Sequence, residues 1–255
     1  MEAGKIRNLL KKTQLIMLIP LLMLSACTAS PEKNGPNESQ NENIQENNGG
    51  TTMPQPQDIS LRASDGVILK ASFYDNNKSS KGLILLHQFS KDRSSWKPWL
   101  QEWQKTHKVI AIDLRGHGES SLKFSDFTDE DFNSMIKDAE AAAEFLGRKE
   151  VKAEAISIIG ASIGANTAQN YASTHLVDKV VLLSPGLTYK GIKLSMKDNT
   201  ALIIASTEDT YSFQSVKELE KNSPTSEFLY LTNKGHGTNM LDKELTEKIA
   251  NYLSE

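Results

Sequence analysis

The sequence has one cysteine, Cys27, among 255 residues, and almost no excess charge of either sign. One cysteine cannot form a disulfide within the chain, so a disulfide-stapled scaffold is excluded. The 29 basic and 32 acidic residues give a net charge of −3, which leaves no positive surplus to neutralise a nucleic-acid backbone. The sequence shows neither metal-ligand spacing of His, Asp and Glu nor a phosphate-binding glycine loop before a lysine. We therefore expect no nucleic-acid partner and no metal.

Long hydrophobic runs are also missing, because the apolar run at residues 15–24 is short and contains Pro20. It is too short to span a bilayer stably. Basic residues precede the run and small residues follow it, which is the order of a secretory signal. The segment ends in Leu24-Ser25-Ala26-Cys27, which resembles the lipobox of bacterial lipoproteins. The alternative is that Cys27 is only a small residue beyond an ordinary cleavage site.

The lipobox resemblance implies a signal peptide over residues 1–26 and a diacylglycerol on Cys27. Two acyl chains are what stable anchoring requires, so the implied location is extracytoplasmic, lipid-anchored to the bacterial cell membrane. After Pro31, and as far as Asp58, only Ile44 and Met53 are appreciably apolar. Such a segment cannot bury enough surface to fold, so residues 27–57 are expected to form a disordered polar tether. The globular domain is expected at residues 58–255.

Alternation about Ser64-Asp65-Gly66 predicts a β-hairpin at the start of this domain. Short apolar runs then predict six buried parallel strands, and helical patterns separate them. The strands are expected at residues 59–62, 67–73, 82–86, 109–113, 155–160, 179–184, 201–206 and 228–231, and the helices at 96–105, 129–146, 163–175, 214–222 and 243–253. The order predicts an α/β fold: a doubly wound, mostly parallel, eight-stranded sheet with helices on both faces.

The motif Gly160-Ala161-Ser162-Ile163-Gly164 stands where the strand at 155–160 meets the next helix. A strained serine at such an elbow leaves no room for neighbouring side chains, which explains the two glycines. Ser162 also lies at a helix N-terminus, where amides and the helix dipole favour developing negative charge. The sequence therefore predicts a nucleophilic serine at this elbow.

A nucleophilic serine needs a base, and the base needs an orienting acid. Asp209 follows the strand at 201–206, and His236 follows the strand at 228–231 between two glycines. With the chain order Ser162, Asp209, His236, residues 59–254 resemble the α/β-hydrolase superfamily. The resemblance implies Ser162 as nucleophile, His236 as general base and then acid, and Asp209 as the orienting carboxylate. Glu208 is the rival acid.

The resemblance further implies an oxyanion hole formed by the backbone amides of Ile163 and Phe89. The chain departs from the family at Gln88, where many members have glycine, and this puts the Phe89 amide in doubt. His87 is interpreted as a brace for this loop. His117, in a segment over 113–120 that also resembles a superfamily signature, is interpreted as structural.

These residues predict a serine hydrolase that cleaves carboxylic esters through an acyl-enzyme, with no cofactor. Only about 16 residues, Pro185 to Thr200, separate two strands where many members insert a helical cap, so no full cap is expected. The segment 185–189 and Phe89 are expected to form opposite lips of an open site for a small ester or an acylated surface polymer. A thioesterase or amidase with the same triad, and a non-catalytic binding module on a hydrolase scaffold, stay open. The oligomeric state is left open.

Overall fold

The computed structural model describes residues 55–196 and 200–255. These residues belong to one compact unit. The expected signal peptide, Cys27 and nearly all of the expected tether lie outside the described residues. Among the helices that are described, none is both long and apolar enough to cross a membrane.

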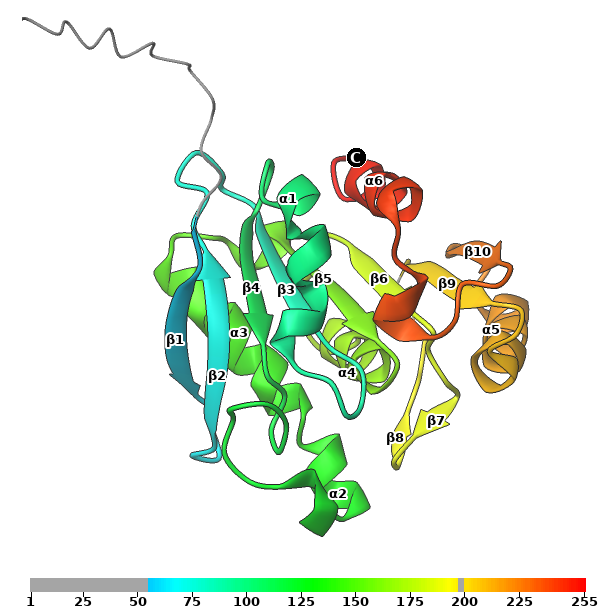
Figure 1. The fold of residues 1–255 in the computed structure, drawn as a ribbon, viewed down its shortest axis with the longest axis horizontal. Coiled ribbons are helices and arrows are strands. Elements are labelled where there is room, and N and C mark those ends of the chain that lie inside the picture. Colours follow the sequence, from blue (N-terminus) through cyan, green and yellow to red (C-terminus); the bar gives the residue numbers. More distant parts are fainter. Residues whose placement is uncertain (1–54, 197–199) are drawn as a thin grey trace, which may run out of the picture. The chain divides into compact units, whose positions relative to one another are not determined.

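One eight-stranded sheet forms the centre of the domain, with the order β1-β2-β4-β3-β5-β6-β9-β10 (Figure 1). β1 and β2 are antiparallel, β2 is antiparallel to β4, and every later pairing is parallel. This confirms the expected mostly parallel, doubly wound sheet. The strands are β1 (Gln57–Arg62), β2 (Ile68–Tyr74), β3 (Gly82–Leu86), β4 (Lys108–Ile112), β5 (Ile156–Ala161), β6 (Val180–Leu183), β9 (Leu202–Ser206) and β10 (Glu227–Leu231).

The loop between β1 and β2 closes the predicted hairpin. Gly66 has a φ of +89°, a left-handed conformation that glycine adopts without steric cost. The Ala63 amide donates to the Val67 carbonyl at 2.9 Å, and the paired strands begin with Arg62 opposite Ile68. The Asp-Gly signal in the sequence therefore marked the turn correctly.

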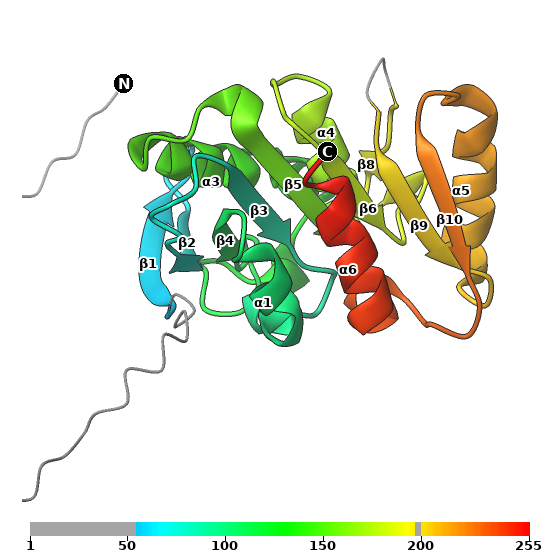
Figure 2. The ribbon, with the colours of Figure 1, turned by 90° about the horizontal axis from the view of Figure 1, so that it is seen from above.

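Helices cover both faces of the sheet (Figure 2). Alternating side chains of the strands belong to the hydrophobic cores on opposite faces. On β3, Ile84 and Leu86 belong to the core beneath α3, α4 and α5, whereas Leu83 and Leu85 belong to the core beneath η1, α1 and α6. The strands are therefore buried on both sides, which explains their continuous apolar runs. The helices are the 3₁₀ helix η1 (Arg93–Trp99), α1 (Leu100–Trp103), α3 (Ile136–Arg148), α4 (Ile163–Ala172), α5 (Thr210–Asn222) and α6 (Lys243–Tyr252).

The helix predicted at 129–146 is two helices, α2 (Asp129–Asn133) and α3, so that prediction was wrong in extent. Its start was correct, because Thr128 and Asp131 form a capping box. The break follows Asn133, whose side chain donates to the Asp129 carbonyl at 2.7 Å. Asparagine and serine compete for backbone groups and favour helix ends, so the pair at 133–134 ends the first helix.

The segment between β6 and β9 contains no helix among its described residues, consistent with the expected lack of a full cap. It forms a small two-stranded sheet, β7 (Thr188–Tyr189) and β8 (Ile192–Lys193), while residues 197–199 lie outside the described part. The contacts of β8 include α2 and α4. Because the carboxyl ends of the parallel strands meet at one edge, the loops after β3, β5, β6, β9 and β10 surround a common site.

Candidate active site

Ser162 occupies a sharp elbow between β5 and α4. Its φ of 54° and ψ of −117° are rare for a residue with a side chain, so the position stores backbone strain. A Cβ on Gly160 would lie 2.1 Å from the Gly164 carbonyl oxygen, and one on Gly164 would lie 2.4 Å from the Leu86 carbonyl oxygen. Neither glycine can carry a side chain while the backbone keeps this path. The strand, elbow and helix are therefore arranged as the motif predicts.

Asp209 and His236 are paired at the same edge of the sheet. Asp209 directly follows the turn after β9, and His236 follows β10; Asp209 Oδ2 lies 2.6 Å from His236 Nδ1. The side chain of Asp209 is 13% exposed and that of His236 is 35% exposed. The carboxylate is therefore shielded while the imidazole is accessible. No hydrogen bond joins Ser162 Oγ to His236 in the described residues, which is common at such sites before substrate binds.

Glu208, the rival acid, faces the backbone of the loop that carries His236. Its carboxylate accepts hydrogen bonds from the amides of Gly235 at 2.7 Å and Asn233 at 2.8 Å, and from the Ser206 hydroxyl at 2.7 Å. These bonds, that from Gly235 first, lower the pKa of Glu208 to about 2. Glu208 therefore holds the shape of the loop, whereas Asp209 contacts the imidazole.

Gln88 ties the loop after β3 to the same His236-bearing loop. Its Oε1 accepts from both the amide of Thr238, at 2.7 Å, and the hydroxyl of Thr238, at 2.9 Å. Gln88 is not among the residues with positive φ, so its backbone does not require glycine. Gln88, where many family members have glycine, thus supplies a side chain that bridges two loops 150 residues apart. This contact could not be predicted from the sequence.

Two serines at strand ends complete this support. Ser184, after β6, accepts from the Gly237 amide at 2.9 Å, and Ser206, at the end of β9, accepts from the Lys234 amide at 3.1 Å. Both serines are fully buried. The loop over residues 233–238, which carries His236, is therefore held by side chains from the ends of β3, β6 and β9. The sequence analysis missed Ser184, although its place at a strand end was a usable signal.

The backbone amides of Phe89 and Ile163, the expected oxyanion donors, lie in the loop after β3 and at the first residue of α4. Neither amide donates to an acceptor within the described chain. The Phe89 ring packs on Phe124 and His117, with ring centroids 4.8 Å and 5.3 Å apart. This packing holds the residue whose amide direction the sequence left in doubt.

His87 lies fully buried beside that loop. Its Nδ1 donates to the Gln88 carbonyl at 2.8 Å, and its Nε2 accepts from the Leu114 amide at 3.0 Å, which defines a neutral tautomer. Burial is the main cause that lowers the pKa of His87 to about 4. His117 is also buried and stacks on Phe124. Both histidines therefore hold loops, as the sequence suggested.

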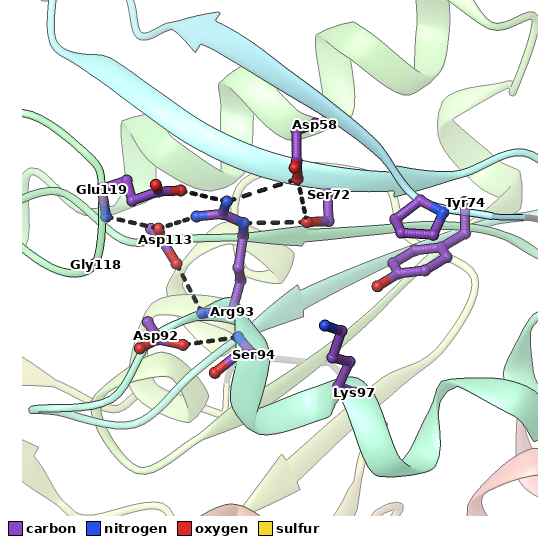
Figure 3. A pocket seen from close by; sticks show the side chains of 11 residues that line it. Asp58, Ser72, Tyr74, Asp92, Arg93, Ser94, Lys97, Asp113, Gly118 and Glu119 are labelled. Carbon is purple, nitrogen blue, oxygen red and sulfur yellow. Dashed lines mark hydrogen bonds and ion pairs between the residues drawn. The ribbon is translucent and has the colours of Figure 1, made fainter.

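A polar cavity of about 310 Å³ lies beside the loops after β3 and β4, and its lining includes none of Ser162, Asp209 and His236 (Figure 3). Its centre is Arg93, which forms ion pairs with Asp113 and Glu119. Asp113 also accepts from the Arg93 amide at 2.7 Å and the Glu119 amide at 2.8 Å. This network joins the two loops and stabilises the side of the site that carries Phe89.

Lys190, the residue after the expected lip at 185–189, contacts the expected opposite lip. The tip of the β7–β8 hairpin brings the Lys190 ammonium 5.1 Å from the centroid of the Phe89 ring and 5.9 Å from that of Phe132. Both distances fit cation–π contacts. The hairpin is therefore joined to the loop after β3. Within residues 55–196 and 200–255, no group of three or more His, Cys, Asp or Glu could hold a metal ion.

Comparisons with known proteins agree with this architecture. An uncharacterized protein of Mycobacterium tuberculosis is 26% identical over 118 residues, which cover 46% of this chain and 32% of that protein, and a Mycobacterium bovis protein matches equally. The chain thus spans about a third of the length of these curated relatives.

Solved structures resemble the fold at low sequence identity. The Pyrococcus furiosus esterase Pf2001 superposes with a TM-score of 0.66 at 21% identity, covering 79% of this chain and 92% of that one. The esterase RhEst1 from a Rhodococcus species gives 0.64 at 15% identity, covering 78% and 98%. The esterase EaEST from Exiguobacterium antarcticum gives 0.62 at 13% identity, covering 78% and 100%.

The family model for the alpha/beta hydrolase fold matches residues 82–222, which are more than half of the chain and include Ser162 and Asp209. The eight-stranded sheet and the elbow at Ser162 have the form that this family requires. The chain belongs to the alpha/beta hydrolase fold family.

Proposed function

We propose that this protein is a serine hydrolase that cleaves carboxylic esters through an acyl-enzyme. The observation that carries the proposal is the strained serine at the β5–α4 elbow together with the His236–Asp209 pair, 2.6 Å apart, at the same edge of the sheet. A serine in this conformation presents Oγ above the sheet, and a carboxylate-bound imidazole is the base that such a serine needs. If these residues had only structural roles, neither the backbone strain at Ser162 nor the pairing of His236 with Asp209 would be required.

The roles follow from the donors and acceptors. Asp209 accepts a hydrogen bond from the N–H group at His236 Nδ1, so Nε2 is left as the basic nitrogen. Nε2 takes the proton of Ser162 Oγ as Oγ bonds to the ester carbon, and then passes that proton to the leaving oxygen as its bond to carbon breaks. The amides of Ile163 and Phe89 would receive the carbonyl oxygen as it becomes negative. A water molecule then repeats these steps on the acyl-enzyme.

The lack of a full cap favours substrates whose acyl group is short or exposed. Among the described residues between β6 and β9, only the β7–β8 hairpin stands where many members carry a cap, and its Lys190 contacts Phe89. Such a site would take a small ester or the exposed acyl groups of a polymer. Esters rank before thioesters and amides because several of the similar structures are named esterases.

We also propose that the enzyme works outside the cytoplasm on a lipid anchor at Cys27. The support is the lipobox-like Leu24-Ser25-Ala26-Cys27 and the apolar-poor segment between it and β1. A flexible coil of roughly 30 residues reaches on the order of 30 Å. That length would hold the catalytic edge clear of lipid headgroups.

A fluorophosphonate probe tests the proposed chemistry, because it phosphonylates activated serines covalently. The wild-type chain should be labelled once, and Ser162→Ala should not be labelled. Ser157→Ala, which removes a buried hydroxyl from β5 with no hydrogen-bond partner among the described residues, is the matched control and should label normally. An unlabelled wild type would support the binding-module alternative, and a labelled Ser162→Ala would place the nucleophile elsewhere.

A further inference from the structure

Tyr189 lies in β7, in the segment that follows β6. β3, which leads to Phe89, is one neighbour of β5, and β6, which leads to Tyr189, is the other. The Tyr189 ring meets the His236 ring edge to face, with centroids 6.3 Å apart. Tyr189 thus stands beside the proposed general base.

The Tyr189 ring is fixed by its neighbours. Tyr211 packs against it edge to face at 5.3 Å and binds the hairpin backbone, donating to the Thr188 carbonyl at 2.6 Å and accepting from the Thr188 amide at 3.1 Å. A Cβ on Gly186 would lie 2.6 Å from Tyr211 and 2.8 Å from Tyr189, so this segment also packs tightly against both rings. The position of the Tyr189 hydroxyl is therefore defined before any substrate arrives.

The Tyr189 hydroxyl itself lacks a strong partner. Its contact with the Ser184 carbonyl is 3.4 Å, well beyond the usual O–H···O distance of about 2.7 to 2.8 Å. The hydroxyl can therefore turn to a better acceptor at little cost. Burial, followed by the negative charge of Asp209, raises the pKa of Tyr189, so the group stays protonated and acts only as a neutral donor.

We propose that Tyr189 is a catalytic residue whose hydroxyl donates a hydrogen bond to the leaving-group oxygen of the ester. The assignment rests on the proposed function. The leaving oxygen must face His236, which protonates it, and Tyr189 stands beside His236. As the bond between carbon and the leaving oxygen breaks, charge builds on that oxygen. Nε2 of His236 gives it the proton, and Tyr189 keeps its own.

A donor that acts at the leaving oxygen has a specific kinetic signature. Its contribution grows with the charge on that oxygen, so it matters most for poor leaving groups such as alkoxides and least for p-nitrophenolate, which stabilises its own charge. One hydrogen bond to a charged group corresponds to a rate factor of about 10 to 100. Loss of a residue that only packs against the site would lower kcat/KM by the same factor for all substrates.

The test uses the full chain and a set of acetate esters that differ only in the leaving alcohol or phenol. For Tyr189→Phe, kcat/KM should fall about 10- to 100-fold for alkyl acetates but less than about threefold for p-nitrophenyl acetate. The dependence of log kcat/KM on leaving-group pKa should therefore steepen. Tyr211→Phe is the matched control: it removes the neighbouring hydroxyl and loosens the hairpin, and it should keep the wild-type dependence whatever its absolute rate.

An equal loss across all leaving groups in Tyr189→Phe, or no loss, would overturn the role of Tyr189. So would a steeper dependence in Tyr211→Phe, because the effect would then belong to the hairpin. Fluorophosphonate labelling separates this failure from failure of the proposed function. A wild type that labels on Ser162 without the predicted change in Tyr189→Phe refutes only the tyrosine; a wild type that does not label refutes the ester mechanism itself.

Discussion

Asp209 Oδ2 lies 2.6 Å from His236 Nδ1, although the two residues come from loops after different strands. The pairing fixes the ring tautomer that a serine hydrolase requires, with the proton on Nδ1 and the lone pair on Nε2. The neighbouring Glu208 binds backbone amides of the His236-bearing loop instead. Adjacent carboxylates thus have separate tasks, one orienting the imidazole and one shaping its loop.

Replacing Asp209 with Asn should retain the fold and lower kcat by up to about 10⁴-fold, because the amide no longer favours the correct tautomer. Glu208→Gln should cost far less, about tenfold or below, since it removes acceptors from the loop but not the partner of the imidazole. Steady-state kinetics with thermal melting as a check on folding measure both. The reverse ranking would make Glu208 the orienting acid.

Gly164→Ala should destabilise the fold by about 2 to 3 kcal/mol or more and should reduce activity further than the stability loss explains. The added Cβ meets the Leu86 carbonyl at 2.4 Å, and only backbone movement at the elbow relieves the contact. Denaturant unfolding and kinetics report the two effects. Gly147→Ala in α3 is the control, because nothing lies within 4 Å of its new Cβ. It should be neutral or stabilising by up to about 1 kcal/mol, and an equal loss in both variants would contradict this view of the elbow.

Acidification should destabilise the protein between about pH 6.5 and pH 4 through its buried histidines. Burial lowers the pKa of His87 and that of His107 to about 4, while an unfolded histidine titrates near about 6.5. In this window the unfolded chain binds protons that the folded chain does not, so the free energy of unfolding falls as pH falls. Each such histidine contributes a loss of up to about 3 kcal/mol.

His87→Gln isolates one of these contributions. Urea unfolding at pH 6.5 and at pH 4 should show a loss of stability about 3 kcal/mol smaller in this variant than in the wild type, whatever its absolute stability. His175→Gln, which removes an exposed histidine at the end of α4, should keep the wild-type loss. An unchanged loss in His87→Gln would show that His87 is protonated in the folded state.

Cys27→Ser should move the full-length chain from the detergent phase to the aqueous phase after expression in a bacterial host. The predicted cause is loss of the thiol that would carry the diacylglycerol, since two acyl chains are needed for stable anchoring. Detergent phase partitioning measures the change, and ester hydrolysis per molecule should not change. Equal partitioning of wild type and Cys27→Ser would remove the lipoprotein assignment.

The sheet and the approximate positions of the site residues could be predicted because each depends on local sequence. The apolar runs are strands buried on both faces, and parallel strands bring their carboxyl ends together, so Ser162, Asp209 and His236, which follow three of these strands, lie at the same edge of the sheet. Two glycines around Ser162 marked a backbone path that no other residue permits.

The supporting contacts could not be predicted because they join distant segments without a local pattern. Gln88 reaches Thr238 across 150 residues, and its sequence signal was only a missing glycine. Tyr189 lies in a short hairpin whose position beside His236 depends on the packing of Tyr211. The break after Asn133 was missed because the apolar periodicity continues across it, while the side-chain hydrogen bond to Asp129 ends the helix.

Trapping the acyl-enzyme shows directly whether Ser162 is the nucleophile. The wild-type chain is mixed with p-nitrophenyl acetate, quenched in acid within the first turnover, digested and analysed by mass spectrometry. We expect a burst of p-nitrophenol that approaches one molecule per protein molecule, and an acetyl group on Ser162. The Asp209→Asn variant should accumulate this acetyl-enzyme more slowly. Hydrolysis without an acetyl group on Ser162, or an acetyl group on another residue that turns over at the catalytic rate, would contradict this role of Ser162.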